Sequence, residues 1–183
     1  MKNIFKIKNE KGFTIIETLV AITILMISIA GPLTIAHKGL LAAVYAHDQV
    51  TASYLAQDAM EYVKNVKDNA ILREDVDGWL GEISQCTFSN KCRADTLTNT
   101  ITNCIENSTC RLYEKTTPSG DGVGYTHNPT DNKATQFYRS FYITPVGDIA
   151  SAKEALLTVR VIWTTGTINN VVEYESQIFN VQK

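Results

Sequence analysis

An apolar run from Phe13 to Ala36 constrains this chain more than any other feature of its sequence. Its 24 residues, FTIIETLVAITILMISIAGPLTIA, contain one charged side chain, that of Glu17. As a helix rising about 1.5 Å per residue, the run is long enough to cross the roughly 30 Å hydrocarbon core of a membrane. We therefore predict a single membrane span close to the N-terminus.

The charges on either side of this run predict its orientation. Residues 1–12 contain four lysines and one glutamate, whereas the whole chain of 183 residues has a net charge of −2, so the part after Gly12 carries −5. Because positive charge stays on the cytoplasmic side, we expect a cytoplasmic N-terminus and an exported remainder. An acidic exported part is not expected to bind nucleic acid, since its only candidate basic cluster is Lys91, Arg93, Arg111 and Lys115.

A cleaved secretory signal peptide is the competing interpretation of the same run. Ser28-Ile29-Ala30 places small residues at both positions of an A-x-A-like cleavage site, which would start the mature protein near Gly31. Two features disfavour it: Glu17 falls where the apolar region of a signal peptide should begin, and the helical pattern continues past Ala36.

Residues 11–27, KGFTIIETLVAITILMI, resemble the N-terminus of type IV prepilins and of the related type II secretion pseudopilins. The segment ETLVAITIL is more similar to minor pilins and pseudopilins than to major pilins. The resemblance implies that a prepilin peptidase removes residues 1–12, a basic leader, by cutting after Gly12. It also implies that Phe13 becomes an N-methylated first residue and that Glu17, at mature position five, directs packing in a filament.

The chemistry of Glu17 agrees with this resemblance. A carboxylate inside a membrane span costs about 2.5–3.5 kcal/mol on insertion scales, so it needs a cationic partner. Cleavage after Gly12 would create an α-amino group on Phe13, four residues away, and the family implies that this amine pairs with the glutamate of a neighbouring subunit. The alternative is that Glu17 lies at a shallow depth, where its carboxylate reaches the membrane interface.

Gly31-Pro32 lies inside the span and predicts a kink, because proline lacks an N–H group and clashes with the preceding turn. The resemblance implies that Pro32 loosens the helix, which helps subunits to leave the bilayer during assembly. An ordinary kinked membrane helix is the alternative.

Residues 37–70 continue the helical period and become amphipathic. The apolar stripe is Ala52, Leu55, Ala59, Tyr62 and Val66. One helix from residue 13 to about residue 69 would be about 85 Å long, so half of it must pack outside the membrane. The stripe predicts packing on a C-terminal domain and, by resemblance, on other pilin helices; a coiled-coil dimer is the alternative.

The remaining sequence divides into two parts. Residues 71–135 are rich in Asn, Asp, Thr, Ser and Gly, which predicts a loop-rich segment. Residues 136–183 contain three alternating segments, QFYRSFYIT, ALLTVRVIW and VVEYESQIF, which predict an antiparallel meander with a hairpin at TTGTINN. We therefore expect an α+β fold, the pilin-like lollipop in which a long N-terminal helix, membrane-spanning in residues 13–36 and amphipathic in residues 37–70, packs on a C-terminal antiparallel sheet.

Four cysteines lie in the predicted exported part, as two Cys-x5-Cys pairs. An even number of cysteines in an oxidising compartment predicts disulfides. Three connectivities are open, and we favour Cys86–Cys92 and Cys104–Cys110 because each closes a small loop in turn-rich sequence. A zinc site is the alternative, but zinc ligand pairs usually lie two to four residues apart, so we expect no metal.

The sequence contains no motif that predicts catalysis or a cofactor. G-x-S-x-G, H-E-x-x-H, P-loop and G-x-G-x-x-G patterns are all absent, and His127, the only histidine after residue 70, has no nucleophile at motif distance. We expect no enzymatic activity and no cofactor.

These expectations together describe a minor type IV pilin-like structural subunit. It would be a single-pass membrane protein with a cytoplasmic N-terminus and an exported head, in contact with lipid before it is assembled into an extracytoplasmic filament. Its expected partners are prepilin peptidase, other pilin subunits that contact its N-terminal helix, and inner-membrane assembly machinery. A type II secretion pseudopilin is one alternative, and a membrane-anchored or secreted extracytoplasmic binding domain is another; a role in motility, adhesion, DNA uptake or secretion is left open.

Overall fold

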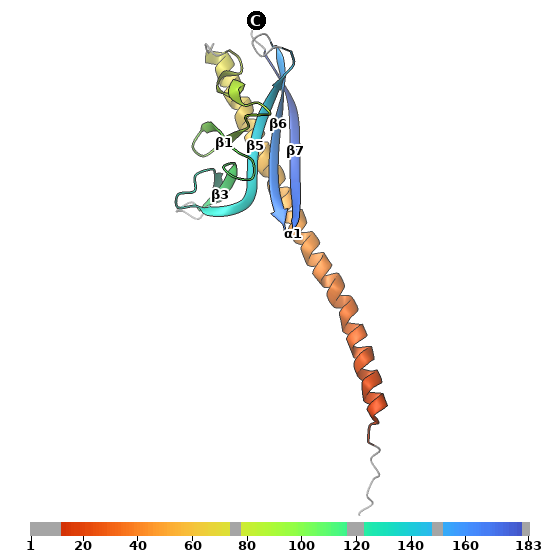
Figure 1. Cartoon of the computed structure of the whole chain (residues 1–183). Coiled ribbons are helices and arrows are strands. Elements are labelled where there is room, and N and C mark those ends of the chain that lie inside the picture. The colour runs from red at the N-terminus through yellow and green to blue at the C-terminus, as the bar shows by residue number, and fades with distance from the viewer. Residues whose placement is uncertain (1–11, 74–77, 117–122, 148–151, 181–183) are drawn as a thin grey trace, which may run out of the picture. The chain divides into compact units, whose positions relative to one another are not determined.

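The computed structural model describes residues 12–73, 78–116, 123–147 and 152–180, and these fall into two compact units, residues 1–45 and 46–183 (Figure 1). We call residues 46–183 the head. One helix, α1, begins at Ile15 and ends at Arg73. After it come a short 3-10 helix and seven strands: Gly81–Gln85, β1 (Cys92–Asp95), β2 (Thr100–Asn103), β3 (Arg111–Thr116), β4 (Val123–Thr126), β5 (Lys133–Pro145), β6 (Glu154–Thr165) and β7 (Ile168–Phe179).

The part of α1 in the first unit has no buried side chain. Thr14 caps the helix, because the backbone N–H of Glu17 contacts the Thr14 side-chain oxygen at 3.3 Å and its carbonyl at 3.1 Å. The helix continues through Pro32. The kink expected there stays a prediction, whereas the single long helix expected from the sequence is confirmed.

The head contains one seven-stranded antiparallel sheet organised around β5, the longest strand. On one side, β5 pairs with β6 from Tyr138 to Pro145, and β6 pairs in turn with β7. On its other side, β5 pairs with β1 at Phe141 and with β3 from Lys133 to Tyr138. The strands β2 and β4 then pair with β1 and β3 respectively. The predicted antiparallel meander is therefore confirmed as β5–β6–β7.

The predicted hairpin joins β6 and β7 through a two-residue loop, Gly166-Thr167. Thr165 pairs with Ile168 across the loop, and Gly166 has φ +64°, a conformation that L-residues with side chains adopt with strain. Glycine at the first central position with positive φ fits a type II′ turn, whose twist matches that of the flanking strands.

Four strands, β1 to β4, lie in the segment for which the sequence predicts loops. Three of them have only four residues and the fourth has six. Such short runs, rich in Asn, Asp and Thr, contain too few alternations to show a period of two. They form strands because β1 and β3 pair with β5, and β2 and β4 pair in turn with β1 and β3, which is a tertiary effect.

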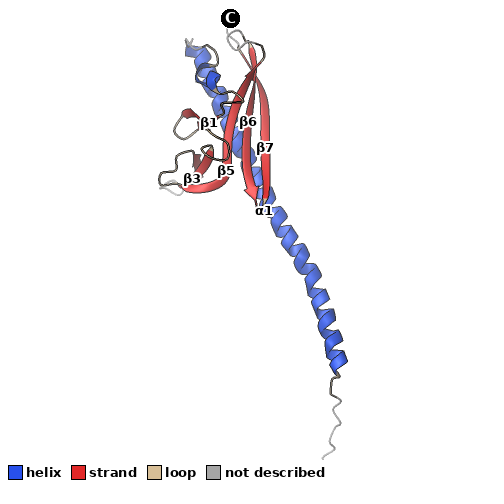
Figure 2. Cartoon of the chain, viewed as in Figure 1, coloured by secondary structure: helices blue, strands red, loops and turns tan. Residues whose placement is uncertain are grey.

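The second half of α1 lies along the sheet in Figure 2, and the buried side chains of the core come from both. Alanine occupies three central helix positions, Ala52, Ala56 and Ala59, each at most 1 % exposed, and small side chains there let the helix approach the sheet closely. The facing strand residues are large: Phe141, Leu157, Val159, Val161 and Trp163. The α+β fold with a long helix packed on a C-terminal antiparallel sheet is therefore confirmed.

Candidate processing and packing site at the N-terminus of α1

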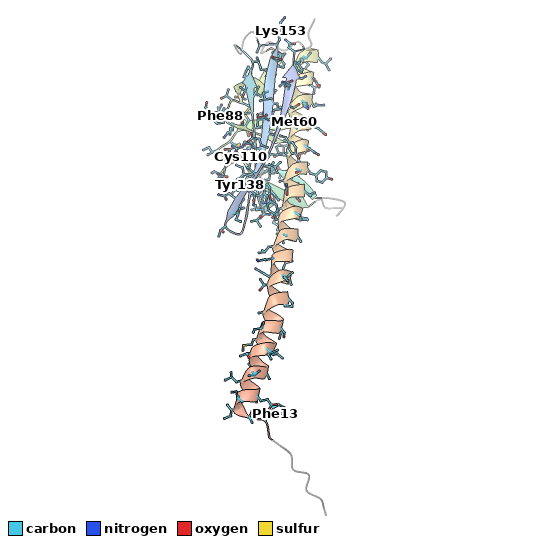
Figure 3. The ribbon with its side chains drawn as sticks, turned by 90° about the vertical axis from the view of Figure 1, so that its right-hand side faces the viewer. Phe13, Met60, Phe88, Cys110, Tyr138 and Lys153 are labelled. Atoms are coloured by element: carbon cyan, nitrogen blue, oxygen red, sulfur yellow. A yellow bond between two sulfur atoms is a disulfide. The ribbon has the colours of Figure 1, made fainter. Side chains whose placement is uncertain are left out.

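Gly12 and Phe13 lie directly before α1, in exposed non-helical chain. The side chain of Phe13, labelled in Figure 3, is 78 % exposed. No atom lies within 4 Å of the position that a Cβ on Gly12 would take. Among the described residues, nothing covers the Gly12–Phe13 peptide bond.

Glu17 lies in the first turn of α1. The unpaired N–H groups of a helix N-terminus carry a partial positive charge, which favours a carboxylate at this position. Among the residues that the structure describes, no cation lies within ion-pair distance of the Glu17 carboxylate. The helix end partly compensates this charge, and a further cation has room to approach it.

The first half of α1 is apolar on all its sides. Every residue from 13 to 46 is exposed, and the mean hydropathy of its best 18-residue window is 2.3. A helix of this kind needs an apolar surrounding over its whole circumference. By length and composition α1 is able to cross a membrane.

Four hydroxyl groups in the helical part of residues 13–36 donate to the backbone of the same helix. Thr18, Thr23, Ser28 and Thr34 each donate to the carbonyl three or four residues earlier, at 2.8 Å in every case. These bonds remove the cost of placing a free hydroxyl in hydrocarbon. Glu17 is left as the only polar group of residues 13–36 whose charge needs a partner from outside the helix.

Comparison with known families matches residues 7–31 to the prokaryotic N-terminal methylation motif. The chain carries the N-terminal motif of type IV pilin- and pseudopilin-like proteins. No curated protein and no solved structure matches the chain. The match contains Gly12, Phe13 and Glu17, so it covers the site described above, and it implies a substrate of prepilin peptidase.

The motif and the apolar helix are together consistent with a single-pass membrane anchor. Of the predicted leader, residues 1–12, residues 1–11 lie outside the described residues. The structure brings together Gly12, Phe13 and Glu17 at one end of α1. Pro32 lies 15 residues after Glu17, about four helical turns along the same half.

The head contains two disulfides, Cys86–Cys92 and Cys104–Cys110, which are the pairs favoured from the sequence. Both lie against β5: the Cys86 carbonyl accepts from the N–H of Ile143 at 2.7 Å, and the Cys110 carbonyl accepts from the N–H of Arg139 at 2.9 Å. The disulfide loops therefore continue the pairing of β5 beyond β1 and β3. Among the described residues, no group of three His, Cys, Asp or Glu side chains could hold a metal ion.

Arg139 is the most deeply buried cation among the described residues of the head, with 1 % of its surface exposed. Its Nη1 donates to the Leu55 carbonyl at 2.9 Å and to the Asp58 carboxylate at 2.7 Å, and its Nη2 donates to the Ala94 carbonyl at 2.7 Å. Burial lowers the pKa of the Arg139 guanidinium, while Asp58 raises it. This side chain ties β5 to α1 and to β1. The sequence shows an arginine among inward-facing strand residues, a signal that its role is internal.

A second buried polar cluster is centred on Asp95, which is 4 % exposed. Its carboxylate accepts hydrogen bonds from the Thr126 hydroxyl at 2.6 Å and from the backbone N–H of His127 at 2.7 Å. Burial alone would raise the pKa of the Asp95 carboxyl, but these bonds and those from the N–H groups of Thr98 and Leu97 hold that pKa below its ordinary value. No sequence motif predicted this cluster.

His127 lies in the same cluster and is 3 % exposed. Its Nδ1 lies 2.9 Å from the Arg111 carbonyl, so a neutral ring donates from Nδ1. Burial, reinforced by the charge of Arg139, lowers the pKa of the His127 imidazole from 6.5 to about 4. The ring is therefore a neutral structural group near pH 7.

The third cluster joins the two disulfide loops. Glu106, between Cys104 and Cys110, accepts from Lys91 at 2.7 Å, from Ser140 at 3.0 Å and from Arg160 at 3.1 Å. Burial raises the pKa of the Glu106 carboxyl, but the bonds from Lys91 and Ser140 and the charge of Arg160 outweigh this and lower the pKa.

The basic residues considered for nucleic acid make contacts inside the head. Lys91 pairs with Glu106; Arg93 donates to Thr102 and to the Thr109 carbonyl at 2.8 Å. Arg111 donates to the Thr135 carbonyl at 2.8 Å. Three of the four candidate cations therefore have protein partners.

Proposed function

We propose that this chain is a minor type IV pilin-like structural subunit, which prepilin peptidase cuts between Gly12 and Phe13 and methylates on Phe13 before it is assembled into a pilus filament. One observation carries the proposal. Inside the matched motif, an exposed Gly12–Phe13 bond lies just before a helix whose first turn holds the Glu17 carboxylate, which has no ion-pair partner among the described residues.

Cleavage would change the electrostatics of this helix end. A new α-amino group on Phe13 would lie within one turn of Glu17, beside N–H groups that also carry partial positive charge. The helix end repels this amine, and the Glu17 carboxylate attracts it. In a filament the Glu17 of one subunit would pair with the Phe13 amine of its neighbour, and in hydrocarbon such a pairing removes the cost of an isolated charge.

The apolar surface of residues 13–45 would contact two different environments in turn. Before assembly it would contact lipid, with the N-terminus on the cytoplasmic side and the head exported. After assembly the same side chains would contact the helices of other subunits, which are as apolar as lipid. Movement between the two surroundings therefore exchanges similar contacts and needs little change in free energy of transfer.

We propose a structural rather than an enzymatic role for the head. Its most buried charged and titratable groups, Arg139, Asp95 and His127, bond to groups of the head itself. They hold the fold together. Nε2 of His127 and Nε of Arg139 have no hydrogen-bond partner among the described residues, but both atoms are buried away from solvent.

The first experiment measures the intact mass and the N-terminal peptide mass of the chain produced in its own host with the peptidase present. The proposal expects a methylated Phe13 terminus. A terminus near Gly31 would show a signal peptide, and an intact Met1 would show an unprocessed anchor; either result contradicts the proposal. Gly12→Glu should retain the leader, whereas Gly39→Ala, at another exposed glycine of α1, should be processed normally.

Incorporation into filaments is measured separately from cleavage. Glu17→Gln should leave the mass of the mature chain that of a processed subunit but reduce its amount in sheared filaments severalfold. Glu61→Gln is the matched control, because it removes an exposed carboxylate from the head part of α1. Equal incorporation of the two variants would contradict the packing role of Glu17.

A type II secretion pseudopilin is the alternative that shares the same motif. Deletion of the gene distinguishes the two: loss of surface pili with normal secretion supports a pilin, whereas loss of secretion with normal pili supports a pseudopilin. Release of a soluble, active domain with no filament defect would support a binding domain instead.

A further inference from the structure

Strand β7 is a long edge strand of the sheet, and we call its unpaired side the free margin. It pairs with β6 over its twelve residues, Ile168–Phe179, and among the described residues with no other strand, and Figure 1 shows it at the outer side of the sheet. At about 3.4 Å per residue this margin is about 40 Å long. The other edge strands, β2 and β4, have four residues each. Natural sheets keep free margins short or protected, so β7 is the exception in this head.

The backbone groups that β7 directs outward follow from its register. The N–H of Asn180, just after the strand, donates to the Lys153 carbonyl at 2.8 Å, and Thr165 pairs with Ile168 across the two-residue hairpin. Because alternate residues of a strand direct N–H and C=O to opposite sides, even-numbered residues bond to β6. The odd-numbered residues direct their N–H and C=O to the free margin: Asn169, Val171, Glu173, Glu175, Gln177 and Phe179.

The same six residues present a mixed apolar and acidic surface. Val171 is 52 % exposed and Phe179 is 46 % exposed. Glu173 pairs with Arg160 at 2.7 Å, while Glu175 is exposed with no ion pair among the described residues. A strand added at this margin would meet an uncompensated negative charge at Glu175, which favours Lys or Arg opposite it.

The acidic residues disfavour a second copy of this chain as the added strand. In the two antiparallel registers that pair the odd-numbered residues of two β7 strands with the longest overlap, Glu173 lies opposite Glu173 or opposite Glu175. Like charges directly opposite each other are destabilising. Self-association in these registers is therefore disfavoured, whereas a strand of another sequence can place a cation opposite Glu175.

A hollow of about 530 Å³ on the same face borders the margin. Its lining includes Asn169 and Val171 of β7, together with Ile162, Tyr138, Asn107 and Arg160, whose charge Glu106 and Glu173 pair. A strand beside β7 would extend this face, so a side chain next to Val171 would reach the hollow. The amides of Asn107 and Asn169 suit a long side chain with a hydrogen-bonding end, and such a pocket adds specificity to backbone pairing.

We propose that the free margin of β7 docks an extended segment of another protein, one that carries Lys or Arg, by strand addition. The backbone groups of the odd-numbered residues supply the binding, and Glu175 and the hollow select the sequence. The proposal does not depend on cleavage at Gly12, because all its groups lie in the head.

The test uses the full chain in detergent micelles and a synthetic twelve-residue peptide that alternates Val or Thr with Lys or Gln. Fluorescence anisotropy should show saturable binding, at least tenfold tighter than that of a peptide with Glu in place of Lys. Hydrogen exchange should slow at the backbone N–H groups of Val171, Glu175 and Gln177. A peptide N-methylated at alternate backbone positions should not bind.

Two variants keep the proposal falsifiable. Val171→Pro removes an outward N–H without touching the β6 ladder and should lower binding at least tenfold; unchanged tryptophan fluorescence verifies its fold. Glu175→Lys retains the backbone and should reverse the preference toward the Glu peptide. Absence of binding, or equal binding of the Lys and Glu peptides, would overturn the proposal. Concentration-dependent self-association that Val171→Pro abolishes would identify a second copy as the occupant and overturn it too.

Discussion

The two halves of α1 differ in whether the chain itself buries their apolar side chains. From residue 13 to residue 45 every side chain is exposed, and the apolar groups face all directions. From residue 46 to residue 73 a single stripe is buried under the sheet, with Ala52, Ala56 and Val63 at 0 % exposure. The first half therefore needs an apolar environment that the described residues do not supply, whereas the sheet of the head supplies one for the second half.

The carboxylates of the two halves show the same difference. Asp58 has a buried cationic partner within its own head, Arg139, at 2.7 Å. Glu17 has none among the described residues, and in the first half the only compensation is the helix N-terminus. A charge with an ion-pair partner in the same chain stabilises the fold, whereas a charge without one favours binding to a cation from outside the chain.

The largest effect is expected from Arg139→Met, which would leave the Asp58 carboxylate without a cationic partner, as Glu17 is among the described residues. The change removes the cation, leaves the Ala94 carbonyl without its donor and should lower the free energy of unfolding of the head by about 2–4 kcal/mol. Trp79 and Trp163 both lie in the head, so tryptophan fluorescence during denaturant unfolding reports on this unit alone. A loss below about 0.5 kcal/mol would show that the pair is dispensable.

Acid should destabilise the head through His127. The unfolded imidazole has a pKa near 6.5 and the folded one about 4, so the unfolded state binds the proton more tightly. This stability is fully present above pH 6.5 and is lost as the pH falls toward 4, by up to about 3 kcal/mol.

The midpoint of thermal unfolding between pH 7 and pH 4 measures this effect. His127→Asn, whose amide can donate to the Arg111 carbonyl in place of Nδ1, should show a shallower pH dependence over that range. An equally steep dependence in the variant would assign the acid sensitivity to other groups.

A matched pair of substitutions compares the helix halves directly. Ala56→Leu adds volume under the sheet and should destabilise the head by about 1–3 kcal/mol. Ala21→Leu makes the same change at an exposed position of the apolar half and should leave head unfolding within about 0.5 kcal/mol of the parent. Equal effects of the two changes on tryptophan-monitored unfolding would contradict the distinction drawn between the halves.

The smallest effect is expected from Gly124→Ala in β4. The added Cβ would lie 2.8 Å from a terminal methyl of Leu97, a side chain that is 48 % exposed and free to turn toward solvent. The free energy of unfolding should change by less than about 1 kcal/mol. A larger loss would show that Leu97 is held rigidly, as a core residue would be.

Much of the molecule could be predicted from sequence where the signal is local. The apolar run, the Gly12–Phe13 motif with Glu17 and the stripe on α1 need only composition and a helical period. The meander needs only a period of two. The short strands β1 to β4 and the Asp95 cluster could not be predicted in this way, because their partners are far apart in sequence: Asp95 bonds to Thr126, 31 residues later.

The sequence by itself determined the membrane-length helix, the processing motif and the α+β class, because each depends on residues within a few turns or one strand of each other. The tertiary structure alone decided which charged side chains have ion-pair partners, that β5 is the centre of a seven-stranded sheet, and that β7 is an edge strand. These depend on which distant segments pair, and pairing places Arg139 beside Asp58 but leaves Glu17 and Glu175 without partners among the described residues.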